Sequence, residues 1–118
     1  MYGPNIDKPV LDEIDQAGLK VIIGFGYDQG GENDILSGSF INYVNTFKNH
    51  SAILMCELGN EYNYHPEWFE GDMNNWYSSL NQAATDIHRV DKKHPVTTAH
   101  GEIPEVLALN SCLDIDIW

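Results

Sequence analysis

Short apolar stretches alternate along this chain with stretches of helical periodicity, and this alternation limits the folds that it can adopt. Apolar runs predict buried strands at residues 19–25, 52–58, 96–99 and 113–118. Apolar residues three or four positions apart predict helices at 7–17, 39–47, 72–90 and 104–109. Helices and strands in strict alternation predict right-handed βαβ units around a parallel sheet, which is an α/β fold. The 118 residues contain no linker and predict one domain, 1–118.

Residues that favour helix ends support these boundaries. Asp7 is suited to cap the first helix, with Pro9 in its first turn, where a missing N–H does no harm. Gly18 follows as a C-terminal stop. Ser39 is suited to cap the second helix, and Asp72 is suited to cap the third and longest one.

The stretch 53–61 contains the strongest candidate for a functional residue. It begins as an apolar run short enough for a buried strand and ends on Gly59, Asn60 and Glu61. Parallel strands covered on both faces have nearly continuous apolar sequences. The loops after such strands carry the chemistry of many α/β folds. The position of this carboxylate therefore predicts an active-site role for Glu61.

Polar or aromatic side chains lie at the end of every predicted strand. Neighbouring parallel strands are about 4.8 Å apart, so groups at their carboxyl ends can surround one small ligand. Aromatic faces stack on sugars, amides bind hydroxyl groups, and a carboxylic acid can protonate a leaving oxygen. The combination predicts a carbohydrate site formed by Tyr27 and Asp28, Asn60 and Glu61, His100 and Glu102, and Trp118.

The formal charge of −12 argues against a nucleic-acid partner and against an anionic membrane surface. No apolar stretch is long enough to span a bilayer, and the turn-like residues 1–5 do not form a signal peptide, so the compartment stays open. The glycine-rich loop 26–38 lacks phosphate-binding patterns, and the histidines lack metal-ligand spacing. We therefore expect no cofactor and no metal. Cys56 and Cys112 are expected to be buried free thiols.

The sequence Glu57-Leu58-Gly59-Asn60-Glu61 after a βα unit resembles the fourth-strand motif of clan A retaining glycoside hydrolases. These enzymes have a (β/α)8, or TIM, barrel and include cellulases, mannanases and β-galactosidases. Residues 19–25 are similar to their third strand, 94–98 to the start of the fifth, and 114–118 to the sixth. The resemblance implies a partial TIM barrel and hydrolysis of β-glycosidic bonds in oligo- or polysaccharides. It makes Glu61 the general acid/base and Asn60 the residue that contacts the sugar 2-hydroxyl.

The same resemblance predicts that this chain is a fragment. Such barrels have about 250 residues or more, and their nucleophile is a glutamate that ends the seventh strand. A retaining mechanism needs two carboxyl groups about 5–5.5 Å apart. Glu102 is the nearest substitute by position, but the resemblance gives it no role. We therefore expect the isolated chain to be inactive, and its open sheet edges to favour self-association.

Each candidate also has a structural interpretation. Glu61 can be a solvated or helix-capping carboxylate, and His100 can be a ligand contact or a packing residue. Trp68 can stack on a sugar or anchor its loop, and the anchor is favoured. Glu57 shares a strand face with Glu61, and a partner or a raised pKa is expected for it. For the whole chain, the alternatives are a non-catalytic carbohydrate-binding domain and a doubly wound α/β module unrelated to glycosidases.

Overall fold

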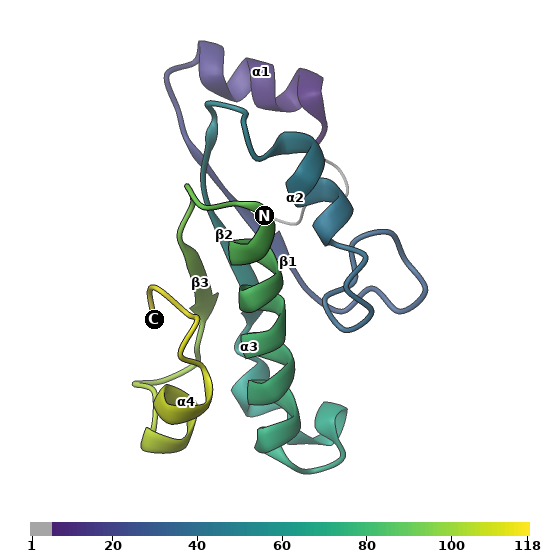
Figure 1. The fold of residues 1–118 in the computed structure, drawn as a ribbon, viewed down its shortest axis with the longest axis vertical. Coiled ribbons are helices and arrows are strands. Elements are labelled where there is room, and N and C mark those ends of the chain that lie inside the picture. The colour runs from purple at the N-terminus through teal and green to yellow at the C-terminus, as the bar shows by residue number, and fades with distance from the viewer. Residues whose placement is uncertain (1–5) are drawn as a thin grey trace.

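The structure is a computed structural model that describes residues 6–118; the turn-like stretch 1–5 lies outside the described residues. Helices and strands alternate, as predicted, around a three-stranded parallel sheet in the order β1-β2-β3 (Figure 1). The α/β fold class is thereby confirmed. The elements are α1 (Lys8–Gln16), β1 (Val21–Phe25), α2 (Ile41–Phe47), β2 (Ile53–Asn60), the 3-10 turns η2 (Tyr62–Tyr64) and η3 (Pro66–Phe69), α3 (Met73–Val90), β3 (Val96–Ala99) and α4 (Val106–Ser111).

Two of the predicted helix caps are present. The Asp7 carboxylate accepts a hydrogen bond from the Val10 N–H at 3.4 Å, and proline lies in the first turn of α1. Gly18 follows α1 with a φ of +73°, a backbone conformation that glycine adopts without steric cost. The Asp72 carboxylate accepts from the Asn74 N–H at 2.9 Å and so begins α3.

The prediction that Ser39 caps the second helix is wrong. Helix α2 begins at Ile41 without a side-chain cap. The Ser39 hydroxyl instead accepts a hydrogen bond from the Asp34 N–H at 2.9 Å and donates one to the Gly31 carbonyl at 3.0 Å. A capping hydroxyl must accept from a backbone N–H of the helix, and here the Ser39 oxygen accepts from the Asp34 N–H in the loop instead. The start of the last helix is closer to its prediction: α4 begins at Val106, two residues after the predicted start at Pro104.

The predicted strand at 113–118 is also wrong, because only one parallel bridge, between Thr97 and Ile117, joins this segment to β3. Backbone N–H groups of Asp116 and Ile117 both donate to the Val96 carbonyl, at 2.9 and 3.2 Å. The Val96 N–H, however, donates to the Asp116 side chain at 2.8 Å. A regular ladder would use a backbone carbonyl there. The side-chain carboxylate replaces it and interrupts a fourth strand.

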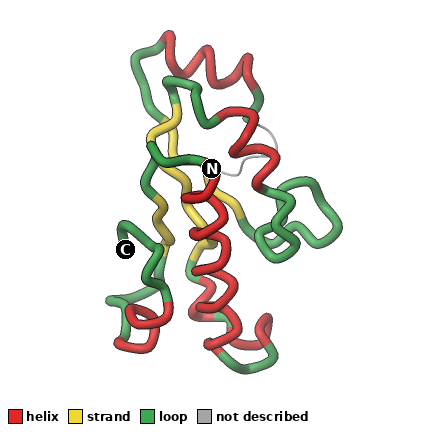
Figure 2. The backbone as a smooth tube through the Cα atoms, viewed as in Figure 1, coloured by secondary structure: helices red, strands yellow, loops and turns green. Residues whose placement is uncertain are grey.

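Helices α2 and α3 lie together on one face of the sheet, and the long loop after β1 extends away from it (Figures 1 and 2). The core lies between this face and α3, whose Trp76, Leu80, Ala84 and Ile87 are at most 1 % exposed. Both cysteines are buried free thiols, as expected. None of the described helices has the length and apolar character needed to cross a membrane.

Candidate functional site

The candidate site lies at the edge of the sheet where the parallel strands end. Strand β2 is the central strand, and Asn60 is its last residue, with Glu61 directly after it. The Glu61 N–H donates to the carbonyl of Ala99, the last residue of β3, at 2.6 Å. Both Asn60 and Glu61 are exposed. The backbone of the neighbouring strand therefore fixes the point at which the chain turns out of the sheet.

Two residues in the left-handed backbone conformation, Gly59 and Glu61, turn the chain at this edge. Gly59 has a φ of +70° and Glu61 a φ of +56°, which is uncommon for a residue that carries a side chain. Gly59 also lies against the core, where an added Cβ would come within 2.8 Å of the Trp76 ring. The close approach of α3 requires glycine at position 59, and the turn that follows exposes the carboxylate.

Turn η2 brings a tyrosine to the loop after β3. The Tyr64 hydroxyl donates to the Gly101 carbonyl, and the Asn63 side-chain oxygen accepts from the Gly101 N–H at 2.8 Å. The pKa of the Tyr64 hydroxyl is raised by partial desolvation and by its interactions with the carboxylates of Glu102 and Glu61. Glu61 and Glu102 thus both act on one tyrosine, although they follow different strands.

His100 lies between two aromatic rings. Its ring centroid is 6.3 Å from that of Tyr77 and 5.5 Å from that of Trp118, which meets it edge-on at 82°. Desolvation lowers the pKa of His100, and the negative charges of Glu105 and Glu102 oppose that change. The resulting shift favours the neutral ring. His100 also lines a pocket of about 190 Å³, together with Asn63, Tyr64, Met73, Tyr77, Glu102, Ile103 and Glu105.

A cluster of aromatic rings lies on the side of the site toward β1. Tyr27 stacks on Tyr62 at 5.3 Å, and its N–H donates to the Tyr62 hydroxyl at 3.0 Å. Trp68 meets Tyr62 edge-on at 5.3 Å and stacks on His65 at 3.9 Å, yet it is 49 % exposed. Trp68 is therefore packed into its loop and also presents part of its ring to solvent.

Tyr27 is more enclosed than a residue at the open end of a strand. Its hydroxyl is buried, and within residues 6–118 it has no hydrogen-bond partner. Burial raises the pKa of Tyr27 to about 12, and the charges of Tyr62 and Asp34 add to the effect. Asp28 is exposed, and its N–H donates to the buried Asp34 carboxylate at 2.9 Å, which holds the loop.

Glu57 does not have the partner that was expected. It is half-buried in β2, in register with Gly24 of β1 and Thr97 of β3. Over residues 6–118, no hydrogen bond or ion pair to its carboxylate is present. This carboxylate lies within strand β2, whereas Glu61 follows the end of the strand.

Several residues of the site were not singled out from the sequence. Asn63, Tyr64 and Tyr77 join the loops after β2 and β3 or line the pocket beside His100. The succession Tyr62-Asn63-Tyr64 directly after Glu61 is the signal that could have found two of them. The stack of His65 on Trp68 also has a local cause, because residues three apart eclipse each other in a 3-10 turn.

The arrangement supplies one exposed carboxylate with an adjacent amide, a second carboxylate, a neutral imidazole and partly exposed aromatic rings. These groups can bind hydroxyl groups, transfer a proton and stack on an apolar ring face. Among residues 6–118, no group of three or more histidine, cysteine or acidic side chains could hold a metal ion. Comparisons of the chain with protein-family models, with curated proteins and with solved structures found no match.

Proposed function

We propose that this chain carries the general acid/base, Glu61, of a retaining glycoside hydrolase that cleaves β-glycosidic bonds in oligo- or polysaccharides. The observation that carries the proposal is an exposed carboxylate directly after the central parallel strand, beside the ends of the neighbouring strands. A group in this position can reach a ligand that lies over the strand ends. The proposal extends to the fold: the three strands are taken as part of a (β/α)8 barrel.

In the proposed reaction, the Glu61 carboxylic acid donates its proton to the glycosidic oxygen while the bond from that oxygen to the anomeric carbon breaks. Asn60 binds the 2-hydroxyl of the sugar, and the exposed part of Trp68 or Trp118 contacts its apolar face. His100, as a neutral ring, can accept or donate a hydrogen bond to a further hydroxyl group.

The reaction also needs a nucleophilic carboxylate about 5–5.5 Å from the acid/base. In the described part of the chain, Glu102 shares Tyr64 with Glu61, but the resemblance assigns the nucleophile to a seventh strand. We therefore expect that this chain alone does not hydrolyse β-glycosides. A nucleophile-independent reaction is needed to test Glu61.

One observation favours the alternative of a non-catalytic carbohydrate-binding domain. Trp68 is half-exposed, and its stack on His65 fixes the ring without covering all of it. A fixed, partly exposed ring binds a sugar face with little loss of side-chain entropy. Binding alone requires no proton transfer, so the two functions differ in what Glu61 must do.

An α-glycosyl fluoride separates the two functions, because it has the configuration of the covalent intermediate and replaces the missing nucleophile. The acceptor hydroxyl attacks the anomeric carbon, fluoride leaves, and Glu61 takes the acceptor's proton. We expect slow formation of β-linked product, detected by mass spectrometry, that falls by about 100-fold in Glu61→Gln. Glu13→Gln on α1 is the matched control and should leave the rate unchanged.

Sugar binding is measured in parallel by NMR titration of the ¹⁵N-labelled chain with β-linked gluco-, manno- and galacto-oligosaccharides. We expect shifts around residues 60–65 and 99–102 that weaken in Asn60→Ala and persist in Asn45→Ala on α2. Binding without transfer would reject the catalytic proposal in favour of the binding domain. Neither binding nor transfer with any of the sugars would reject both.

A further inference from the structure

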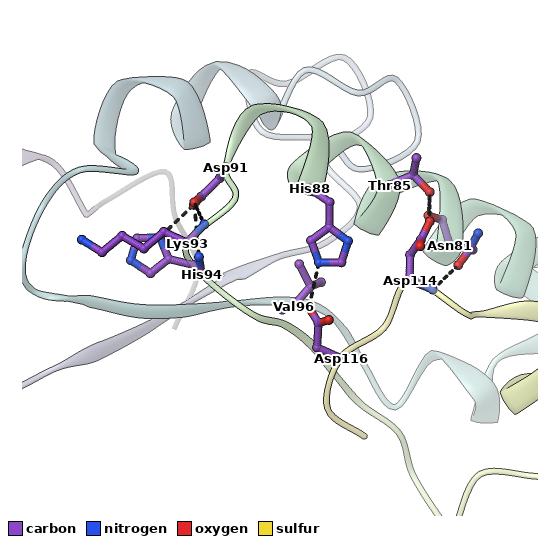
Figure 3. Close-up of polar contacts among 9 residues, drawn as sticks. All are labelled: Asn81, Thr85, His88, Asp91, Lys93, His94, Val96, Asp114 and Asp116. Atoms are coloured by element: carbon purple, nitrogen blue, oxygen red, sulfur yellow. Dashed lines mark hydrogen bonds and ion pairs between the residues drawn. The ribbon is translucent and has the colours of Figure 1, made fainter.

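Residues 113–118, here called the acidic strap, run alongside α3 and beside β3 (Figure 3). Two aspartates, Asp114 and Asp116, alternate with apolar residues in the strap. Ile115 between them is buried, at 7 % exposure. The two carboxylates have specific partners, so this alternation is more than the usual solvation of a surface segment.

Asp114 is held at two points by α3. The Thr85 hydroxyl lies within hydrogen-bond distance of both the Asp114 carboxylate and the Asn81 carbonyl, and the Asp114 N–H donates to the Asn81 side-chain oxygen at 2.9 Å. Asn81 and Thr85 are one helical turn apart and lie on the same face of α3. Figure 3 shows both side chains pointing toward the strap.

Asp116 joins the strap to two elements at once. His88, the next residue along the same face of α3, has its Nε2 atom 2.7 Å from the Asp116 carboxylate. The Val96 N–H of β3 donates to the same carboxylate oxygen at 2.8 Å. Hydrogen bonds to a charged acceptor are stronger than those between neutral groups. Asp116 therefore fixes the strap against both α3 and the first residue of β3.

The strap ends at the candidate site. Trp118 lies two residues beyond Asp116 and is half-buried. Its one ring contact in the described part of the chain is the edge-on contact with His100 at 5.5 Å. His100 in turn lies beside Tyr77 of α3. The Trp118 ring also packs against the buried core, and the contacts that hold the strap help to fix its position beside His100.

We infer that Asp114 and Asp116 are positioning residues, which hold the acidic strap on α3 and thereby keep Trp118 against His100 at the edge where a sugar would bind. The relation of this contact to sugar affinity rests on the proposed function. The placement of Trp118 by the two carboxylates does not, and it can be tested without any ligand.

The test uses the indole N–H resonances of the three tryptophans, assigned through Trp→Phe variants. In Asp116→Ala we expect the Trp118 resonance to move toward the position of an unfolded chain, and the nuclear Overhauser effect between Trp118 and His100 to disappear. Trp76, which is 1 % exposed, reports whether the core is intact. Asp116→Asn retains an acceptor for the Val96 N–H and should restore much of the native spectrum.

His88→Ala is a second variant for the case that Asp116→Ala does not fold, because it changes a half-buried helix position and leaves the Val96 hydrogen bond in place. Asp86→Ala is the control, since Asp86 lies on α3 but bonds to Gln82 and Arg89 of the same helix. If the Trp118 resonance does not move in either Asp116→Ala or His88→Ala, the inference is overturned.

Oligosaccharide affinity, measured on the same samples, should fall about fivefold when Trp118 is released, as for the loss of one net hydrogen bond or contact. Release of Trp118 without a change in affinity would overturn its role at the site. If the wild-type chain binds no oligosaccharide, the proposed function fails, while the indole resonance still decides whether the carboxylates place Trp118.

Discussion

A single residue, Gly59, joins the core to the candidate site. Its φ of +70° and the nearby Trp76 ring both disfavour a side chain at this position. We predict that Gly59→Ala lowers the free energy of unfolding by about 3 kcal/mol, which combines left-handed backbone strain with overpacking. Urea unfolding followed by tryptophan fluorescence measures this change.

The matched control for this prediction is Gly38→Ala. Gly38 has a φ of +82°, but an added Cβ would meet no atom within 4 Å. Only the backbone strain applies, so the expected cost is about 1 kcal/mol. Equal costs at both positions would show that Trp76 yields to the new methyl group, and that the close packing of α3 does not fix the turn before Glu61.

At the scale of elements, the turn from α3 to β3 depends on one buried aspartate–histidine pair. Asp91, which ends α3, is 4 % exposed, and its carboxylate lies 2.7 Å from the His94 ring. It also accepts from the backbone N–H groups of Lys93 at 2.9 Å and His94 at 3.2 Å (Figure 3). Burial raises the pKa of Asp91, but these hydrogen bonds outweigh burial and hold it below the ordinary value of 3.8.

The direction of this pKa shift predicts a dependence of stability on pH. A carboxyl group whose pKa is lower in the folded state stabilises the fold above its unfolded pKa, and the effect disappears as pH falls through the folded value. We predict that Asp91→Ala costs about 3 kcal/mol at pH 7. The difference between variant and wild type should stay constant down to about pH 5 and shrink below about pH 4.

Urea unfolding at several pH values measures the Asp91 effect. Asp86→Ala on the same helix is the control, because its ion pair with Arg89 is 3.5 Å long and involves an exposed arginine. Its cost should be within about 1 kcal/mol at every pH. A difference for Asp91→Ala that does not change between neutral and acidic pH would contradict the assignment of a lowered pKa.

Prediction from the sequence succeeded where a local pattern decides the structure. The caps at Asp7 and Asp72 act on backbone groups two or three residues away, and the period of α3 determines which of its residues are buried. Prediction failed where a distant group competes for the same hydrogen bond. Ser39 bonds to Asp34 and Gly31 rather than to α2, and Asp116 takes the Val96 N–H that a fourth strand would need.

In the candidate site, too, local sequence predicted the positions of some residues but not the contacts between distant ones. The place of Asn60 and Glu61 at the end of a parallel strand followed from the apolar run before them. The link between Tyr64 and Gly101 spans 37 residues, and the stack of Tyr27 on Tyr62 spans a similar distance along the chain. Contacts of this range depend on the sheet order, which the sequence pattern alone does not contain. The roles of all these residues in catalysis stay predictions.

At the scale of the whole molecule, apolar surface and net charge act in opposite directions on association. Around α4, Ile103, Val106 and Leu113 are 92, 72 and 79 % exposed. Ile22 of β1 is also partly exposed, on a sheet of which α2 and α3 cover one face (Figure 1). Exposed apolar side chains and open strand edges favour association, whereas a formal charge of −12 on every copy opposes it.

Because salt screens repulsion between exposed charges and leaves apolar association intact, we predict that the chain self-associates and that salt strengthens this association. Light scattering after size-exclusion chromatography, at low and high salt, measures the mass. The double variant Ile103→Gln, Val106→Gln should shift the chain toward monomer at unchanged net charge. Leu36→Gln, at a 53 % exposed position in the loop after β1, is the control and should not. A monomer at high salt with a cooperative thermal transition would contradict the prediction, because the exposed apolar residues around α4 would then not drive association.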